Sequence, residues 1–182
     1  PYDAKQIYMA QISNLDKKYD PAIEPIRALY DEYFGGGMNS IVFQEMRETR
    51  GLAYSAWASI MPPSYLKYPY VLRTQIATQN DKMIDAVTTF NDIINNMPES
   101  EAAFKLAKDG LTNRLRTERI IKGDIIWSYI NAQDLGQNVD PRIKLYNDIQ
   151  NMSLKDIVDF QKQWVKGRTY VYCILGLSLI HI

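Results

Sequence analysis

The feature that most constrains the fold is a change of hydrophobic period near residue 80. Before it, two runs rich in β-branched and aromatic residues, LAYSAWASI and YPYVLRTQIAT, flank the turn-rich segment MPPSYLK. This pattern predicts an antiparallel hairpin with a long connection. From Asp81 to Met97 the apolar residues recur at helical spacing instead, and Pro98 ends the stretch. The chain therefore combines a sheet with helices.

The remaining segments extend this prediction. Strands are expected over residues 5–12 and 168–175. Helices are expected over residues 20–34, 40–50, 100–120, 124–136, 141–152 and 154–166. Because strands and helices do not alternate regularly, the order does not suit a parallel doubly wound fold. The predicted class is α+β, a mainly antiparallel sheet with helices packed on one face.

The composition is that of an ordinary globular chain. Its 182 residues are 46% hydrophobic, and 21 basic residues balance 21 acidic ones, so charge indicates neither nucleic acid nor an anionic membrane as a partner. No apolar run reaches the roughly 20 residues of a membrane span. We expect one domain over residues 1–176. Residues 177–182, LSLIHI, resemble a translated sequencing adapter and are expected to be a non-native or truncated tail.

The residue types needed for metal or nucleophilic catalysis are missing. The only histidine, His181, lies in that tail, and the single cysteine, Cys173, lies in an apolar strand where we expect a buried structural thiol. Neither a zinc site nor a hydrolytic triad can be assembled from them. Acidic pairs such as Asp31 and Glu32 lie on charged helix faces, where we expect solvated carboxylates.

One stretch, FGGGMNSIVFQEMRETRGLAY, carries the most information about function. Gly35, Gly36 and Gly37 lack the GKS or GKT ending of a phosphate-binding loop. They stop one helix and either let backbone approach backbone or let a loop move. Considered alone, Arg47 is a charge on a helix surface and Tyr54 a half-buried strand residue.

Taken as one unit, the same stretch resembles the hallmark of the later, non-zinc half of the zinc peptidases related to pitrilysin, insulin-degrading enzyme and mitochondrial processing peptidase. The matching residues are Gly35 to Gly37, Ser40, Val42, Phe43, Arg47, Glu48, Gly51, Leu52 and Tyr54. The order of elements follows the family over about residues 5 to 176. The zinc motif H-x-x-E-H of the other half is absent, and Ile41 replaces a basic residue common after the serine.

The resemblance implies that the chain is the non-catalytic half of a zinc metallopeptidase and is inactive alone. It would hold no cofactor, and zinc would be held by a homologous partner half, in the same polypeptide or in a separate subunit. Tyr54 would donate a hydrogen bond to the scissile carbonyl oxygen, and Arg47 would hold a substrate carbonyl. Gly35, Gly36 and Gly37 would form a substrate-binding loop, with the peptide extended along a sheet edge.

Two alternatives stay open. In the first, the chain is a catalytically silent scaffold or partner subunit of the same fold, like the structural relatives in respiratory complexes. In the second, it is a free-standing module that binds extended peptides without a partner. The presence of both Arg47 and Tyr54 favours the peptidase half, because a scaffold needs neither. The compartment stays open between the bacterial periplasm and the cytoplasm.

Overall fold

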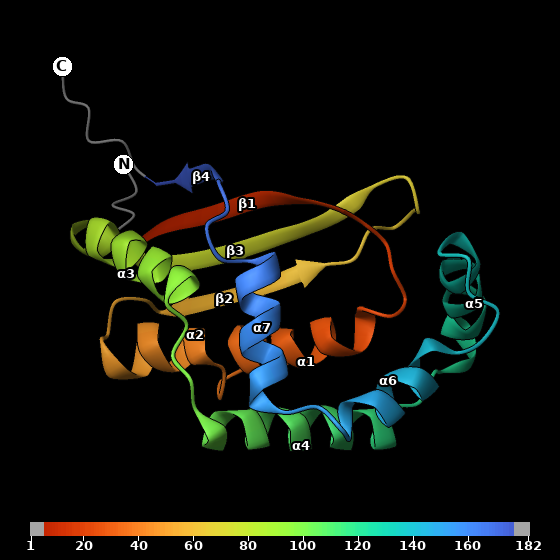
Figure 1. Cartoon of the computed structure of the whole chain (residues 1–182). Helices are drawn as coiled ribbons and strands as arrows, with labels where there is room; N and C mark the ends of the chain where they lie inside the picture. Colours follow the sequence, from red (N-terminus) through yellow and green to blue (C-terminus); the bar gives the residue numbers. More distant parts are fainter. Residues whose placement is uncertain (1–5, 177–182) are drawn as a thin grey trace.

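The computed structural model describes residues 6–176 as a four-stranded antiparallel sheet with helices packed on one face (Figure 1). Its strands are β1 (Gln6–Lys18), β2 (Ser55–Met61), β3 (Pro69–Gln79) and β4 (Val171–Leu175). Their spatial order is β2-β3-β1-β4, with every neighbouring pair antiparallel. The predicted α+β class and the hairpin of β2 and β3 are confirmed. The expected tail, residues 177–182, lies outside the described residues.

Helices occupy all the segments for which they were predicted. They are α1 (Glu24–Phe34), α2 (Ile41–Phe43), α3 (Met83–Asn95), α4 (Glu101–Thr117), α5 (Ile125–Asp134), α6 (Pro141–Ile149) and α7 (Leu154–Trp164). A π-helical segment, η1 (Gln44–Thr49), continues α2, and the 3-10 turns η2 (Asn80–Lys82) and η3 (Lys122–Asp124) precede α3 and α5. Of the helices described over residues 6–176, none has both the length and the hydrophobicity to cross a membrane.

Alternation along β3 shows which face of the sheet the helices cover. Tyr70, Leu72 and Ile76 are fully buried, whereas Arg73 on the opposite face is exposed. Helix α7 contributes Trp164, whose ring lies 5.3 Å from that of Tyr70, edge to face. Such aromatic pairs combine large buried area with favourable ring geometry. The core lies between the sheet and α1, α3 and α7, and α4 packs against α1 on the side away from the sheet (Figure 1).

The prediction that Cys173 is buried is wrong, and the position of its strand in the sheet explains why. Cys173, expected to be a buried thiol, is exposed. Cys173 belongs to β4, an edge strand whose five residues are all exposed, and it lies opposite Ala10 of β1. The local apolar run correctly predicted a strand, but only the order of strands in the sheet determines that this strand is at the edge.

The outer edge of β2 is closed by α1 and by the loop that follows it. In an antiparallel edge strand, every second residue directs its N–H and C=O away from the sheet. Ile60 donates its N–H to Asp31 Oδ1 over 2.8 Å, and its carbonyl accepts from Arg27 Nη1 over 2.9 Å. Next to it, a Cβ on Gly35 would lie 2.3 Å from the oxygen and 2.4 Å from the nitrogen of Ala58. The loop therefore approaches β2 backbone to backbone.

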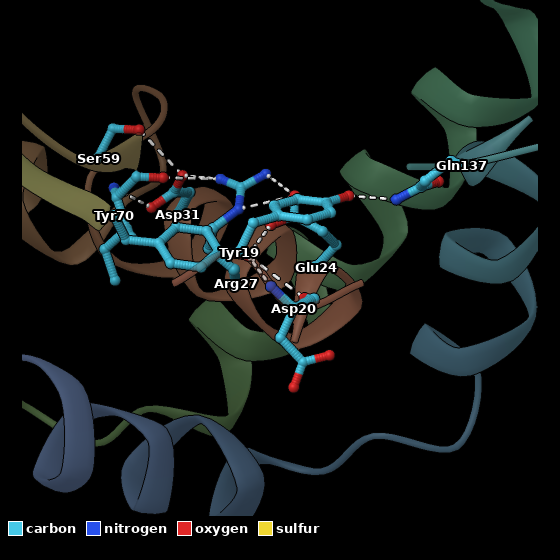
Figure 2. Close-up of polar contacts among 9 residues, drawn as sticks. Tyr19, Asp20, Glu24, Arg27, Asp31, Ser59, Tyr70 and Gln137 are labelled. Carbon is cyan, nitrogen blue, oxygen red and sulfur yellow. Dashed lines mark hydrogen bonds and ion pairs between the residues drawn. The ribbon is translucent and has the colours of Figure 1, made fainter. Parts of the chain in front are cut away.

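The side chains that close this edge belong to a polar network on α1 (Figure 2). Arg27 pairs with Asp31 over 2.8 Å and with Glu24 over 2.9 Å, and all three side chains are less than 20% exposed. Tyr70 donates its hydroxyl to Glu24 over 2.7 Å, and Ser59 donates to Asp31 over 2.9 Å. The expectation of a solvated Asp31 is therefore wrong. Burial raises the pKa of Asp31 to about 6, although Arg27 and the hydrogen-bond donors from β2 lower it.

The close approach at Gly35 predicts a strong effect of a single methyl group. Gly35→Ala should lower the free energy of unfolding by about 3 kcal/mol, because its Cβ would displace the β2 backbone. Gly37→Ala is the matched control, since the nearest atom to its Cβ would be Glu32 Oε1 at 3.9 Å, and it should change stability by less than about 1 kcal/mol. Urea denaturation followed by circular dichroism measures both. Equal stabilities of the two variants would contradict the close approach.

Asp31 predicts a pH dependence of stability. A carboxyl whose pKa is raised in the folded state binds its proton more tightly there, so its contribution is complete below about pH 4 and is lost as pH rises through about 6. The free energy of unfolding of the wild type minus that of Asp31→Asn should therefore increase as pH falls from 7 to 4. Its slope has an upper limit of about 1.4 kcal/mol per pH unit.

Asp140→Asn is the control for this pH series. Its hydrogen bond with Arg142 holds the pKa of Asp140 below its usual value, so its contribution is lost only in stronger acid. The same difference for Asp140→Asn should stay nearly flat between pH 5 and 7. A flat Asp31 difference would mean that its carboxyl is not desolvated.

Candidate functional site

Arg47 lies in the π-helical segment η1, where an ordinary helix was predicted. Met46, which is fully buried, accepts hydrogen bonds at its carbonyl from both Leu52 N, at 2.8 Å, and Ala53 N, at 3.2 Å. The chain therefore leaves the helix through a wider turn than an α-helix makes and runs directly toward β2. Short π-helical segments are rare and occur frequently at functional sites.

The guanidinium of Arg47 is half-exposed and only loosely held. Its carbon Cζ lies 5.1 Å from the centre of the Phe43 ring, and Nε lies 3.6 Å from Glu48 Oε1. Within residues 6–176 these are the contacts recorded for the guanidinium, and the distance to Glu48 is too long for a good hydrogen bond. Most of its five N–H donors are therefore available to a ligand.

Tyr54 lies immediately before β2. Its backbone N–H donates to the carbonyl of Ala77 in β3 over 2.8 Å, which attaches it to the sheet. The residue is 48% exposed, and its hydroxyl oxygen accepts a hydrogen bond from Gln79 Nε2 over 2.7 Å. The hydroxyl is thus both accessible and held in place.

The turn between Arg47 and Tyr54 is held by residues at the end of β3 and in η2. Gly51 has φ +58°, which glycine adopts without strain. Its carbonyl accepts from Lys82 Nζ over 3.1 Å, and the Leu52 carbonyl accepts from Thr78 Oγ1 over 2.6 Å. A hollow of about 70 Å³ lies here, lined by Gly51, Leu52, Ala53, Tyr54, Gln79 and Lys82.

The structure brings together only part of the predicted site. Arg47 does not line this hollow, and neither does any of the three glycines. Gly35 packs against β2 instead, and the two glycines after it are exposed. A larger hollow of about 460 Å³ lies between Tyr19 and α5, but it shares no lining residue with the hollow at Tyr54.

Gln79 and Lys82 were not identified from the sequence. The predicted hairpin contained a signal for Gln79, because the register places Ser55 opposite Ala77 and so brings the end of β3 beside the residue before β2. No local pattern marks Lys82, which reaches Gly51 only because the chain turns at η2.

The described residues do not fit a zinc site. Residues 6–176 contain no histidine, and Cys173 is the one cysteine, exposed on β4. The same residues contain no group of three or more His, Cys, Asp or Glu side chains placed to hold a metal ion.

Solved structures share this fold. A peptidase M16 inactive domain from Pseudomonas fluorescens matches with a TM-score of 0.75 at 15% identity, over 98% of this chain and 42% of that one. The inactive peptidase domain of a Bordetella parapertussis protein described as a zinc protease gives 0.73 at 12% identity, over 94% of each chain. A chain of complex III2 from Candida albicans gives 0.67 at 14% identity, over 96% of this chain and 44% of that one.

Sequence comparison identifies the family. A search of curated proteins finds no match. The family model described as the peptidase M16 inactive domain matches residues 13–111, more than half of the 182 residues, and includes the segment from Gly35 to Tyr54. With the fold and the absence of an H-x-x-E-H motif, this match confirms the predicted resemblance: the chain belongs to the peptidase M16 inactive-domain family.

Proposed function

We propose that residues 1–176 act as one unit, the non-catalytic half of a zinc metallopeptidase. In this proposal a homologous half, in the same polypeptide or in a separate subunit, holds the zinc ion. The chain supplies groups that bind and polarise the peptide substrate across the interface. The family match to an inactive peptidase domain supports the role of a half without metal.

The observation that carries the proposal is the state of the Tyr54 hydroxyl. Gln79 occupies an acceptor position of its oxygen, and an amide nitrogen cannot accept the phenolic proton in return. That proton is therefore free to be donated to a substrate. An O–H donor fixed in advance where a carbonyl oxygen gains negative charge is the arrangement that stabilises the transition state of peptide hydrolysis.

Arg47 and the glycine loop have different proposed roles. The available guanidinium donors of Arg47 suit a peptide carbonyl or a carboxylate, which supports a role in holding the substrate. For Gly35 the contact with the β2 backbone supports a structural role, and Gly36 and Gly37 remain the part of the loop that could face a peptide. The loop would thus support the strand that follows Tyr54.

The sheet edges indicate how a peptide would approach. The outer edge of β2 is covered at Ala58 and Ile60, so a peptide strand cannot add there without displacing α1 and its loop. Of the described strands, β4 has an uncovered outer edge, but β1 and β3 separate it from β2. We infer that a peptide positioned at Tyr54 pairs its backbone with the zinc-holding half, and that this chain contacts it through side chains.

A scaffold role is the alternative that a specific observation favours. The same fold occurs in complex III2 from Candida albicans, so the architecture also serves in an assembly. A scaffold would show no peptide cleavage in its intact natural assembly. Cleavage that depends on Tyr54 would exclude that alternative.

The proposal predicts the effect of removing one oxygen atom. In the assembled peptidase, Tyr54→Phe should lower kcat on an extended peptide by about 10²-fold, because it removes a single oxyanion donor. Tyr65→Phe is the matched control, since Tyr65 is similarly exposed but lies in the connection between β2 and β3. Steady-state kinetics on both variants gives the result. Unchanged turnover of Tyr54→Phe in an active assembly would rule out the role assigned to Tyr54.

A further inference from the structure

We infer that Gln79 is a positioning residue for the Tyr54 hydroxyl and that its amide determines whether Tyr54 can act as a donor. This inference rests on the proposed function of Tyr54. It adds a residue outside the segment that carries the resemblance, at the far end of the neighbouring strand. Of the groups that meet in this pair, the Gln79 amide nitrogen can only donate, whereas the Tyr54 hydroxyl can both donate and accept.

The backbone holds both residues of this pair in register. Ser55 lies opposite Ala77, and Tyr54 N–H bonds to the Ala77 carbonyl, so Tyr54 and Gln79 start from adjacent positions on two paired strands. Gln79 is the last residue of β3 and lies opposite Gln6 of β1. The backbone of Gln79 is therefore fixed by its pairing with β1, and this position sets how its side chain reaches Tyr54.

In the hydrogen bond between Gln79 and Tyr54, the amide is the donor and the hydroxyl oxygen is the acceptor. Nε2 of Gln79 donates to the Tyr54 hydroxyl oxygen over 2.7 Å. A phenol has one proton, and the amide nitrogen leaves that proton to another acceptor. A hydrogen bond accepted by the oxygen also polarises the O–H bond, which strengthens the bond that the hydroxyl donates. Gln79 thus orients the proton away from β3 and makes Tyr54 a better donor to a developing oxyanion.

The hollow beside the pair also suits an electron-rich substrate group. The hollow beside the pair also contains Lys82, whose ammonium donates to the Gly51 carbonyl over 3.1 Å. A cation lining the same hollow favours an electron-rich substrate group there over a second donor. The hollow then has donors from two side chains, Tyr54 and Lys82, around a space of about 70 Å³.

Two substitutions separate the orienting role from simple packing. Gln79→Met keeps the length of the side chain but cannot donate, so kcat in the assembled peptidase should fall about fivefold, as for the loss of one neutral hydrogen bond. Gln79→Glu offers an acceptor, which takes the Tyr54 proton away from the substrate. Its kcat should fall about 10²-fold, to the level of Tyr54→Phe, with KM nearly unchanged.

Gln75→Glu is the matched control. Gln75 lies four residues earlier on the same face of β3, opposite Trp57 and Ala10, and does not line the hollow. The same change of charge there should leave kcat within twofold of the wild type. Thermal unfolding of each variant checks that the fold is kept.

The outcomes distinguish this inference from the proposed function. If Tyr54→Phe lowers kcat but Gln79→Met and Gln79→Glu both stay within twofold of the wild type, the role of Gln79 is overturned and the proposed function stands. If Tyr54→Phe itself leaves kcat unchanged, the proposed function fails first. In the expected case, Gln79→Glu combined with Tyr54→Phe is no slower than Tyr54→Phe alone, because both changes remove the same donated proton.

Discussion

The architecture depends on how the exposed backbone of β2 is satisfied. An edge strand carries unpaired N–H and C=O groups, and leaving them buried without partners costs free energy. Here Arg27 and Asp31 of α1 bond both groups of Ile60, and Gly35 brings the next loop against Ala58. The same contacts fix α1, the glycine loop and, through the loop, the start of α2. The segment that contains Arg47 and Tyr54 therefore follows directly after a loop that is packed against the edge of β2.

A closed edge changes what this chain can offer a peptide. Main-chain pairing needs a free edge, and at Ala58 and Ile60 the edge of β2 is covered by α1 and its loop. What remains are side-chain donors held by the ends of β3 and η2. A half that donates hydrogen bonds and a half that pairs with the substrate backbone would divide the work of recognition between them. This division is consistent with a family domain described as inactive.

Local signals in the sequence predicted most elements, and non-local contacts account for the failures. The hairpin and the helices follow from hydrophobic period, and Ser100 and Ser153 occupy the N-cap positions of α4 and α7. The turn that follows the π-helical segment is held by two hydrogen bonds to the Met46 carbonyl, from Leu52 and Ala53, that no local pattern predicts. Asp31 has the sequence surroundings of a surface carboxylate, and only its contact with β2 makes it a buried one. Arg47 and Tyr54 were predicted by resemblance and stay predictions, and Gln79 could have been placed beside Tyr54 from the hairpin register.

The most direct measurement is a crystal structure of the assembled two-half protein with an extended peptide bound. We expect the Tyr54 hydroxyl oxygen about 2.7–3.1 Å from the carbonyl oxygen of the bond to be cut, the range of an oxyanion donor. We also expect the peptide backbone to pair with the zinc-holding half, with Gln79 still bonded to Tyr54. A peptide added as a strand to β4, or a Tyr54 hydroxyl without a peptide contact, would contradict the proposed division between the two halves.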